Sequence, residues 1–136
     1  MQVLTTDFKD TIGYDYTSTE RPFYLLDAII AIIIDDNKKK TYLRLEKGYT
    51  SDGCTLKKCF WLLLGCPHTP KYLPASILHD WLIEHPAAIS YNRNFSSRAF
   101  KQMLLQAGVS ETRAQLMYIA VEAWQALSNL WRHRWR

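Results

Sequence analysis

The sequence places an ionisable pair, His79 and Asp80, among apolar residues in the middle of a predicted helix over residues 72–85. A buried carboxylate is costly unless water, a partner group or a metal ion satisfies it. Histidine is the side chain best suited to proton transfer near neutral pH. We therefore treat His79 as a candidate catalytic base, and Asp80 as a candidate catalytic and cation-binding carboxylate.

The spacing of this pair limits what it can do. Adjacent helix positions point about 100° apart, so His79 and Asp80 cannot both face one site squarely. We expect one of them to face a pocket while the other secures a backbone or a neighbouring loop. A purely structural alternative stays open, in which Asp80 caps the loop at Asp52 and His79 is a hydrogen-bonded core histidine.

A second candidate site is the loop Thr50–Thr55, between the last predicted strand and the next predicted helix. Asp52 can ligate a metal ion or orient His79, and the glycine that follows it lets backbone amides approach a ligand. Asp52 and Asp80 are therefore the predicted ligands of a divalent cation, calcium or zinc. The alternative is an ordinary helix N-cap made by Ser51, Asp52 or Thr55.

Cysteine chemistry is a less specific prediction. Cys54 could act as a nucleophile activated by His79. Cys54, Cys59, Cys66 and His68 could bind zinc, but their spacing matches no paired zinc-ligand motif. Three cysteines in 136 residues are too few for a disulfide scaffold and indicate a reducing compartment.

The C-terminal end alternates aromatic and cationic residues, and we predict that it binds a partner through Trp131, Arg132, Arg134, Trp135 and Arg136. The chain has 17 basic and 13 acidic residues, and the excess lies in its C-terminal third. Such a segment can contact an acidic protein, phosphates or anionic lipid. We favour a protein over nucleic acid or anionic lipid. The alternative is a solvated helix end whose cations suit the helix dipole.

We expect strands before Gly48 and helices after it. The predicted strands are Gln2–Phe8, Phe23–Ile34 and Lys40–Leu45, with a loop at Asp10–Arg21 and a hairpin turn at Asp35–Lys38. The β-branched density of the second strand predicts burial on both faces. The alternation in the third predicts one exposed face.

After Gly48 the spacing of apolar residues becomes helical. The predicted helices are Leu56–Leu64, Tyr72–His85, Ser96–Ala107 and Glu111 to about Arg132, the last with an apolar stripe at Met117, Ala120, Val121, Trp124, Leu127 and Trp131. We expect an α+β fold, with a small N-terminal antiparallel β-sheet followed by about four α-helices. One domain over residues 1–136 is expected, β-rich over 1–50 and helical over 51–136.

Membrane insertion and export are not indicated by the sequence. The most apolar stretch, Leu25–Ile34, contains Asp27 and is shorter than the ~20 residues that a membrane span needs. The residues after Met1 lack the basic start and apolar core of an export signal. We therefore expect a soluble protein with no transmembrane segment.

Taken together, the two motifs resemble an uncharacterised phage and prophage family, catalogued as domain of unknown function thirteen-fifty-three. Glu46–Leu56, followed by Trp61, resembles its G-F-x-T-D-G-A-S-x-P stretch, and Ala75–Ile83 resembles its A-x-x-x-H-D-x-L-Y helix. The similarity extends over roughly residues 44–125 and includes Ser97–Gly108 and Arg113–Trp124.

The chain departs from that family pattern at four positions. Cys54 replaces the usual Ala, Lys57 the usual Pro, Ile83 the usual Tyr, and Phe100 an Asp of the A-D-x-x-F helix. A looser likeness links the H-D helix to bacterial A2-type phospholipases, in which the histidine activates water and the aspartate binds calcium. Ala75 stands where those enzymes have the disulfide partner of the loop cysteine.

The resemblance implies a phage-encoded protein, located in the host-cell cytoplasm or incorporated in the virion. One hypothesis is a metal-assisted hydrolase of ester or amide bonds, with His79 as the base and Asp80 and Asp52 holding a cation or orienting the imidazole. The alternative is a non-catalytic virion component or host-interaction protein, which presents its basic aromatic C-terminal helix to another phage or host protein. The H-D helix favours the first hypothesis and Phe100 favours the second.

Overall fold

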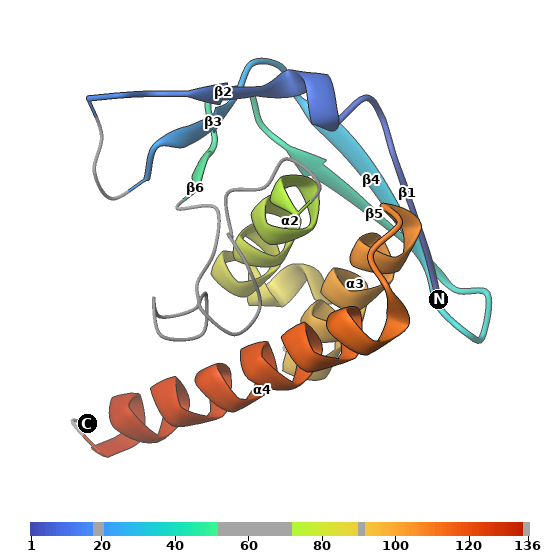
Figure 1. Cartoon of the computed structure of the whole chain (residues 1–136), viewed down its shortest axis with the longest axis vertical. Coiled ribbons are helices and arrows are strands. Elements are labelled where there is room, and N and C mark those ends of the chain that lie inside the picture. Colours follow the sequence, from blue (N-terminus) through green and yellow to red (C-terminus); the bar gives the residue numbers. More distant parts are fainter. Residues whose placement is uncertain (18–20, 52–71, 90–91, 135–136) are drawn as a thin grey trace.

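The computed structural model describes residues 1–17, 21–51, 72–89 and 92–134. Asp52, the loop that follows it and the predicted helix over 56–64 lie outside these residues, as do Trp135 and Arg136. Within the described residues the fold is α+β, as expected, with small antiparallel sheets and three α-helices (Figure 1).

The first sheet contains β1 (Gln2–Thr5), β4 (Ile29–Ile34) and β5 (Lys40–Leu45), in the order β1-β4-β5. The predicted hairpin is confirmed, since β4 and β5 pair antiparallel with Ile34 opposite Lys40. The Asp35 carboxylate closes the turn by accepting the backbone N–H groups of Asn37 and Lys39, each at 2.9 Å. Asp35 thus fixes the register of the hairpin.

The prediction that Phe23–Ile34 forms one strand is wrong. β3 (Phe23–Leu25) pairs with β2 (Ile12–Tyr14) and β6 (Thr50–Ser51) in a second sheet, and β4 begins only at Ile29. The Asp27 carboxylate accepts the next backbone N–H at 2.8 Å, a local bond that interrupts the strand. The predicted loop over residues 10–21 accordingly contains β2, and residues 9–11 form a short 3₁₀ turn.

β4 is buried on one face rather than on both. Ile29, Ala31 and Ile33 face the core, whereas Ile30 is 37% exposed. In β5, Leu43 and Leu45 are buried and Tyr42 is exposed, which confirms the alternation expected there. The helices therefore cover only one side of this sheet.

The helical part begins with α2 (Leu73–Glu84), followed by a 3₁₀ turn (Pro86–Ile89), α3 (Arg93–Gln106) and α4 (Glu111–Arg134). Asn92 caps α3 by accepting the Phe95 N–H at 3.1 Å. Ser110 caps α4 as expected, since its hydroxyl accepts the Arg113 N–H at 3.3 Å. None of the helices in the described residues is long and apolar enough to cross a membrane.

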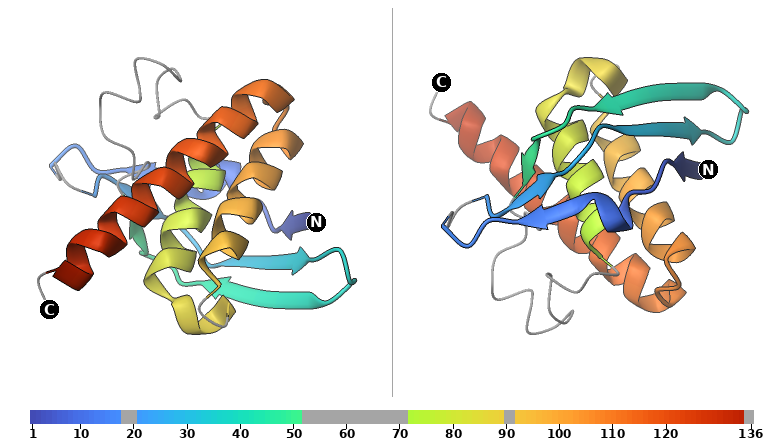
Figure 2. Two further views of the ribbon diagram at one scale, coloured as in Figure 1. Left: turned by 90° about the horizontal axis from the view of Figure 1, so that it is seen from below. Right: turned by 90° about the horizontal axis from the view of Figure 1, so that it is seen from above.

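These elements stack in layers (Figures 1 and 2). α2 and α3 lie side by side beneath the sheet, and α4 crosses them on the side away from the sheet. The core between the layers is made of Val3, Ile29, Ile33, Leu43, Leu45, Ile77, Leu78, Leu82, Leu104 and Val121, among others. α2 is the central element, and eight of its side chains are buried.

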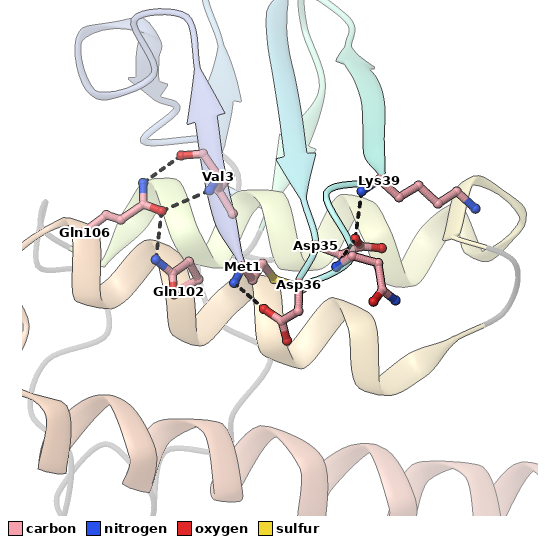
Figure 3. A network of polar contacts seen from close by, with 8 residues as sticks. Met1, Val3, Asp35, Asp36, Lys39, Gln102 and Gln106 are labelled. Carbon is pink, nitrogen blue, oxygen red and sulfur yellow. Dashed lines mark hydrogen bonds and ion pairs between the residues drawn. The ribbon is translucent and has the colours of Figure 1, made fainter.

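Two amide hydrogen bonds attach β1 to α3 (Figure 3). The Gln106 side chain accepts the Val3 N–H at 2.9 Å and donates to the Val3 carbonyl at 2.6 Å. β1 is an edge strand, so Gln106 satisfies backbone groups that would otherwise lack a sheet partner. At the same end, the N-terminal ammonium pairs with the Asp36 carboxylate at 2.8 Å.

We predict that Gln106→Ala lowers the free energy of unfolding by about 1–2 kcal/mol, because both Val3 backbone groups lose a partner in a half-buried position. Urea unfolding followed by circular dichroism measures this change. Gln2→Ala, on the exposed side of the same strand, is the matched control and should alter stability much less. Equal effects of the two substitutions would contradict the role assigned to Gln106.

Candidate functional site

α2 carries His79 and Asp80 where the helix is buried on almost every side. Their side chains are 2% and 4% exposed, respectively. Pro74 fits the first turn, because a helix start leaves that N–H unpaired in any case. Since neither side chain reaches solvent to any extent, the protein itself has to satisfy their polar atoms.

Asp80 contacts the second sheet. The Ser51 hydroxyl, in β6, donates to Asp80 Oδ2 at 2.6 Å, and both residues are buried. This is a short, charge-assisted hydrogen bond. Ser51 immediately precedes Asp52, so the bond brings the start of the loop motif against the H-D helix.

A polar cluster of Arg21, Tyr49, Thr50 and Glu84 surrounds this contact. Glu84, at the end of α2, accepts the Tyr49 hydroxyl at 2.7 Å and forms an ion pair with Arg21 at 2.8 Å. Arg21 also donates to the Thr50 hydroxyl at 3.1 Å and to the Thr50 carbonyl. The cluster attaches the C-terminal end of α2 to the strands β3 and β6.

The charges in this cluster stabilise one another. Partial burial, followed by the hydrogen bond to the Glu84 carboxylate, raises the pKa of Tyr49, so its hydroxyl stays protonated and donates. Burial lowers the pKa of Arg21, but the hydrogen bond to Glu84 and the negative charges of Glu84 and Asp80 outweigh this effect, and the pKa is raised overall. The Arg21 guanidinium is therefore a countercharge for both carboxylates of α2.

His79 points toward α4 rather than toward the second sheet. Its Nε2 lies 2.8 Å from Gln125 Nε2, and with this orientation of the amide the ring accepts and Gln125 donates. Gln125 Oε1 in turn lies 3.5 Å from the Ser97 hydroxyl of α3. Burial lowers the pKa of His79 to about 3, so the imidazole is neutral at physiological pH.

Phe100 packs directly against this imidazole, with the two ring centroids 5.2 Å apart. The resemblance described under the sequence analysis implies an aspartate at this position. In this chain the histidine thus has an apolar ring and a neutral amide as neighbours, and no carboxylate is seen to bond it within the described residues. Such surroundings suit a neutral core histidine better than a base activated by an acid.

The predicted site residues are therefore only partly brought together. His79 and Asp80 bond partners in different layers, and Asp52 lies outside the described residues, so the Asp52–Asp80 metal pair stays a prediction. The cysteines proposed as nucleophile or zinc ligands also lie outside them. Across residues 1–17, 21–51, 72–89 and 92–134, no group of three or more His, Cys, Asp and Glu could hold a metal ion.

The sequence analysis did not predict the residues that bond His79 or lie around Asp80. Gln125 carried a recognisable signal, since it lies four residues after Val121 and so on the buried side of a helix, where a polar residue needs a partner. Arg21, Tyr49 and Glu84 carried none, because their contact depends on how β3, β6 and α2 meet. Ordinary surface charges look the same in the sequence.

The outer face of α4 is a second candidate site. Leu116, Ile119 and Leu127 are 52%, 51% and 51% exposed, and Ala123 between them is also exposed. The expected stripe is confirmed for the buried Met117, Ala120 and Val121 but is wrong for Leu127. α4 extends past α2 and α3 toward its C-terminus, so described residues of the core do not cover it there (Figure 1).

α4 remains helical through Arg134, which includes three of the five predicted partner-binding residues, Trp131, Arg132 and Arg134. Their side chains lie outside the described part of the chain, as do the whole of Trp135 and Arg136. The prediction that this end binds a partner is untested.

We predict that the free energy of unfolding of His79→Gln depends less on pH, below about pH 6.5, than that of the unmodified protein. Folded His79 resists protonation down to about pH 3, whereas unfolded histidine takes up a proton near pH 6.5. The stability contributed by the neutral ring is complete above the unfolded pKa and is lost as the pH falls toward the folded pKa. The loss is up to about 1.4 kcal/mol per pH unit.

Urea unfolding at about pH 7.5, 6 and 5 measures this slope. The free energy of unfolding of His79→Gln should decrease less between about pH 6 and about pH 5 than that of the unmodified protein. Gln2→Ala, which alters an exposed side chain without an ionisable group, should keep the original slope. Identical slopes for His79→Gln and the unmodified protein would contradict the burial of a neutral imidazole.

Comparison with known proteins identifies the family of this chain but does not assign it an activity. Over 74 residues, 54% of this chain, the sequence is 31% identical to "Uncharacterized protein y4jT" of Sinorhizobium fredii (strain NBRC 101917 / NGR234). The matched part spans only 21% of that relative's length. No solved structure matches this chain significantly.

The family profile described as "Protein of unknown function (DUF1353)" matches residues 29–121, which is more than half of the chain. The matched region runs from β4 to the middle of α4 and includes both His79 and Asp80. It begins after β1, β2 and β3. This chain therefore belongs to the DUF1353 family of proteins of unknown function.

Proposed function

We propose that this protein is a non-catalytic docking protein, which binds another protein through the outer face of α4. The observation that carries the proposal is the row of exposed apolar side chains Leu116, Ile119, Ala123 and Leu127. Apolar residues exposed singly are ordinary, but a row of them along one helix face is typical of a protein-binding surface.

The charge pattern of α4 supports a protein partner. From Ala114 to Trp131 the helix has one charged residue, Glu122, and that side chain lies near Asn94 of α3, at 3.3 Å. A helix that lies on a membrane surface or on nucleic acid carries lysine and arginine along its polar flanks. The middle of α4 lacks them, which favours an apolar protein surface.

The surroundings of His79 also support a non-catalytic role. The ring is buried, bonded to Gln125 and packed on Phe100, and its lowered pKa makes it a weak base at neutral pH. A phage origin, with residence in the host cytoplasm or in the virion, belongs to this proposal and rests on the resemblance of the two motifs to phage and prophage proteins.

A photo-cross-linking residue placed at position 119 tests this proposal in cells that express the protein. We predict a cross-linked adduct at Ile119 and none when the same residue replaces Gln2, which is exposed in β1. The mass of the adduct identifies the bound protein. Absence of any adduct at position 119, or equal labelling at both positions, would contradict docking through α4.

A second candidate is the metal-assisted hydrolase of ester or amide bonds, and one observation favours it. The bond between Ser51 and Asp80 places the beginning of the loop motif against the H-D helix, as a site shared by Asp52 and Asp80 requires. Calcium needs six or more oxygen ligands, and Asp80 with Ser51 supplies a small part of such a set. The hydrolase therefore depends on ligands beyond the described residues.

Calorimetric titration of the purified chain with calcium and with zinc tests this second candidate. If it is correct, Asp52→Asn and Asp80→Asn should each abolish binding, while Glu46→Gln, an exposed acid in the same region, should not. Hydrolysis of a p-nitrophenyl ester should disappear in His79→Ala. Retention of hydrolysis in His79→Ala would contradict the assignment of His79 as the base.

A further inference from the structure

β5 leaves one edge of the first sheet open among the residues that the structure describes. The order of this sheet is β1-β4-β5, so β1 and β5 are its two edge strands (Figure 2). At the β1 edge, Gln106 bonds both backbone groups of Val3. At the β5 edge, no described residue bonds the outward backbone groups. An open edge offers these groups to another extended chain.

The bonds on the other side of β4 fix which residues of β5 point toward the open edge. In an antiparallel pair, residues alternate between bonding the neighbouring strand and pointing away from it. The N–H and C=O of Ile30 both bond Thr6, at 3.1 and 3.0 Å, so Ile30 does not bond Arg44, its partner in β5. Lys40, Tyr42 and Arg44 therefore each direct one N–H and one C=O toward the open edge.

The side chains of the same three residues lie on the solvent face of the sheet. Tyr42 is 67% exposed, and Lys40 and Arg44 are exposed on either side of it. Arg44 forms an ion pair with the exposed Glu46 at 3.0 Å. An exposed pair of this kind contributes little, so another carboxylate can replace Glu46. The open edge thus presents an aromatic ring between two cations.

We propose that the β5 edge, defined as Lys40, Tyr42 and Arg44, binds an extended acidic segment of another protein, which adds to the sheet as an antiparallel strand. In strand addition, backbone hydrogen bonds give affinity and alternate side chains give specificity. The edge selects an acid opposite Lys40, an apolar residue opposite Tyr42 and an acid opposite Arg44. The bound segment therefore has two acids four residues apart, with an apolar residue midway between them.

The same charges disfavour a second copy of β5 as the occupant. A two-fold antiparallel pair centred on Tyr42 would place Lys40 of each copy opposite Arg44 of the other. Like charges directly opposite each other destabilise a sheet, and lysines on edge strands prevent such self-association. The charge of the edge is therefore complementary to an acidic chain and not to itself.

The turn before β5 adds to the positive charge of this edge. Lys38 and Lys39 are exposed there. The two acids of the turn already have partners, because Asp35 accepts backbone N–H groups and Asp36 pairs with the N-terminal ammonium. An acidic segment therefore meets an excess of positive charge, and its binding should weaken as salt is added.

Fluorescence anisotropy tests the proposal with the purified full chain and a labelled synthetic peptide, Thr-Glu-Val-Phe-Val-Glu-Thr, whose ends are blocked. The contact is smaller than the roughly 1,200 Å² of a stable interface, so we expect a dissociation constant on the order of tens of micromolar. The peptide with lysine in place of both glutamates should bind about tenfold more weakly or not at all.

Methylation of the peptide backbone separates strand addition from charge attraction. In the antiparallel register the phenylalanine donates its N–H to the Tyr42 carbonyl, whereas the valine N–H groups point away from β5. N-methyl-phenylalanine should therefore weaken binding by about tenfold, because it removes one of the backbone hydrogen bonds and places a methyl group in the contact. N-methylation of the valine that follows should leave the affinity nearly unchanged.

Charge variants of the protein give a second test. Arg44→Glu should bind the glutamate peptide about tenfold more weakly and should gain affinity for the lysine peptide. Lys47→Glu makes the same charge change at an exposed residue beyond the end of β5 and should have a much smaller effect. Glu46→Gln should strengthen binding, because it releases Arg44 from its ion pair. Circular dichroism checks that each variant is folded.

Amide hydrogen exchange measured by NMR locates the bound peptide. The N–H groups of Tyr42 and Arg44 should exchange fast in the free protein and several-fold more slowly with saturating peptide. The N–H groups of Leu43 and Leu45 bond β4 and should be protected in both states. This readout separates strand addition from binding elsewhere on the protein.

Equal affinity for the glutamate and lysine peptides, or unchanged exchange at Tyr42 and Arg44, would overturn the proposal. Protection of these two N–H groups in concentrated protein without peptide would assign the edge to a second copy and would also overturn it. So would binding to phosphatidylserine vesicles but not to the peptide, which would assign this face to a membrane surface. Docking through α4 is unaffected by these outcomes, because α4 lies on the side of the helices away from the sheet (Figure 1).

Discussion

The need to satisfy two buried polar side chains on α2 governs how the layers of this protein meet. α2 lies between the sheet and α4, and it carries Asp80 and His79 where water has almost no access. A buried charge without a partner would destabilise the fold by several kcal/mol. Asp80 therefore requires the hydroxyl of Ser51 on one side, and His79 requires the amide of Gln125 on the other. Each bond fixes one neighbour of α2 in place.

The same constraint bears on where this protein can bind a ligand or a partner. A helix whose polar groups are bonded within the protein has little capacity left for a substrate. The outer face of α4 presents the opposite case, because the apolar side chains of Leu116, Ile119 and Leu127 have no cover among the described residues. Burial of such a face by a partner is favourable, since it removes apolar area from water.

The neighbours of His79 distinguish this chain from the motif that it resembles. An aspartate beside the imidazole would favour the protonated ring and orient it for proton transfer. Phe100 instead adds an apolar ring at 5.2 Å, and Gln125 supplies a neutral donor. Burial among such neighbours lowers the pKa of His79, so the imidazole stays neutral. The H-D helix of this chain therefore holds a histidine whose surroundings favour the neutral ring.

Short-range patterns in the sequence determined the α+β class, the hairpin around Asp35, the Ser110 cap and the approximate positions of three helices. Hydrophobic periodicity and side chain–backbone bonds are local, so a single chain segment contains them. Tertiary structure alone decided that the chain changes sheets at residues 26–28, that Arg21 meets Glu84, that Gln125 bonds His79 and that Leu127 is exposed. These outcomes depend on which surfaces other elements cover, and the spacing of residues within one segment does not contain that information.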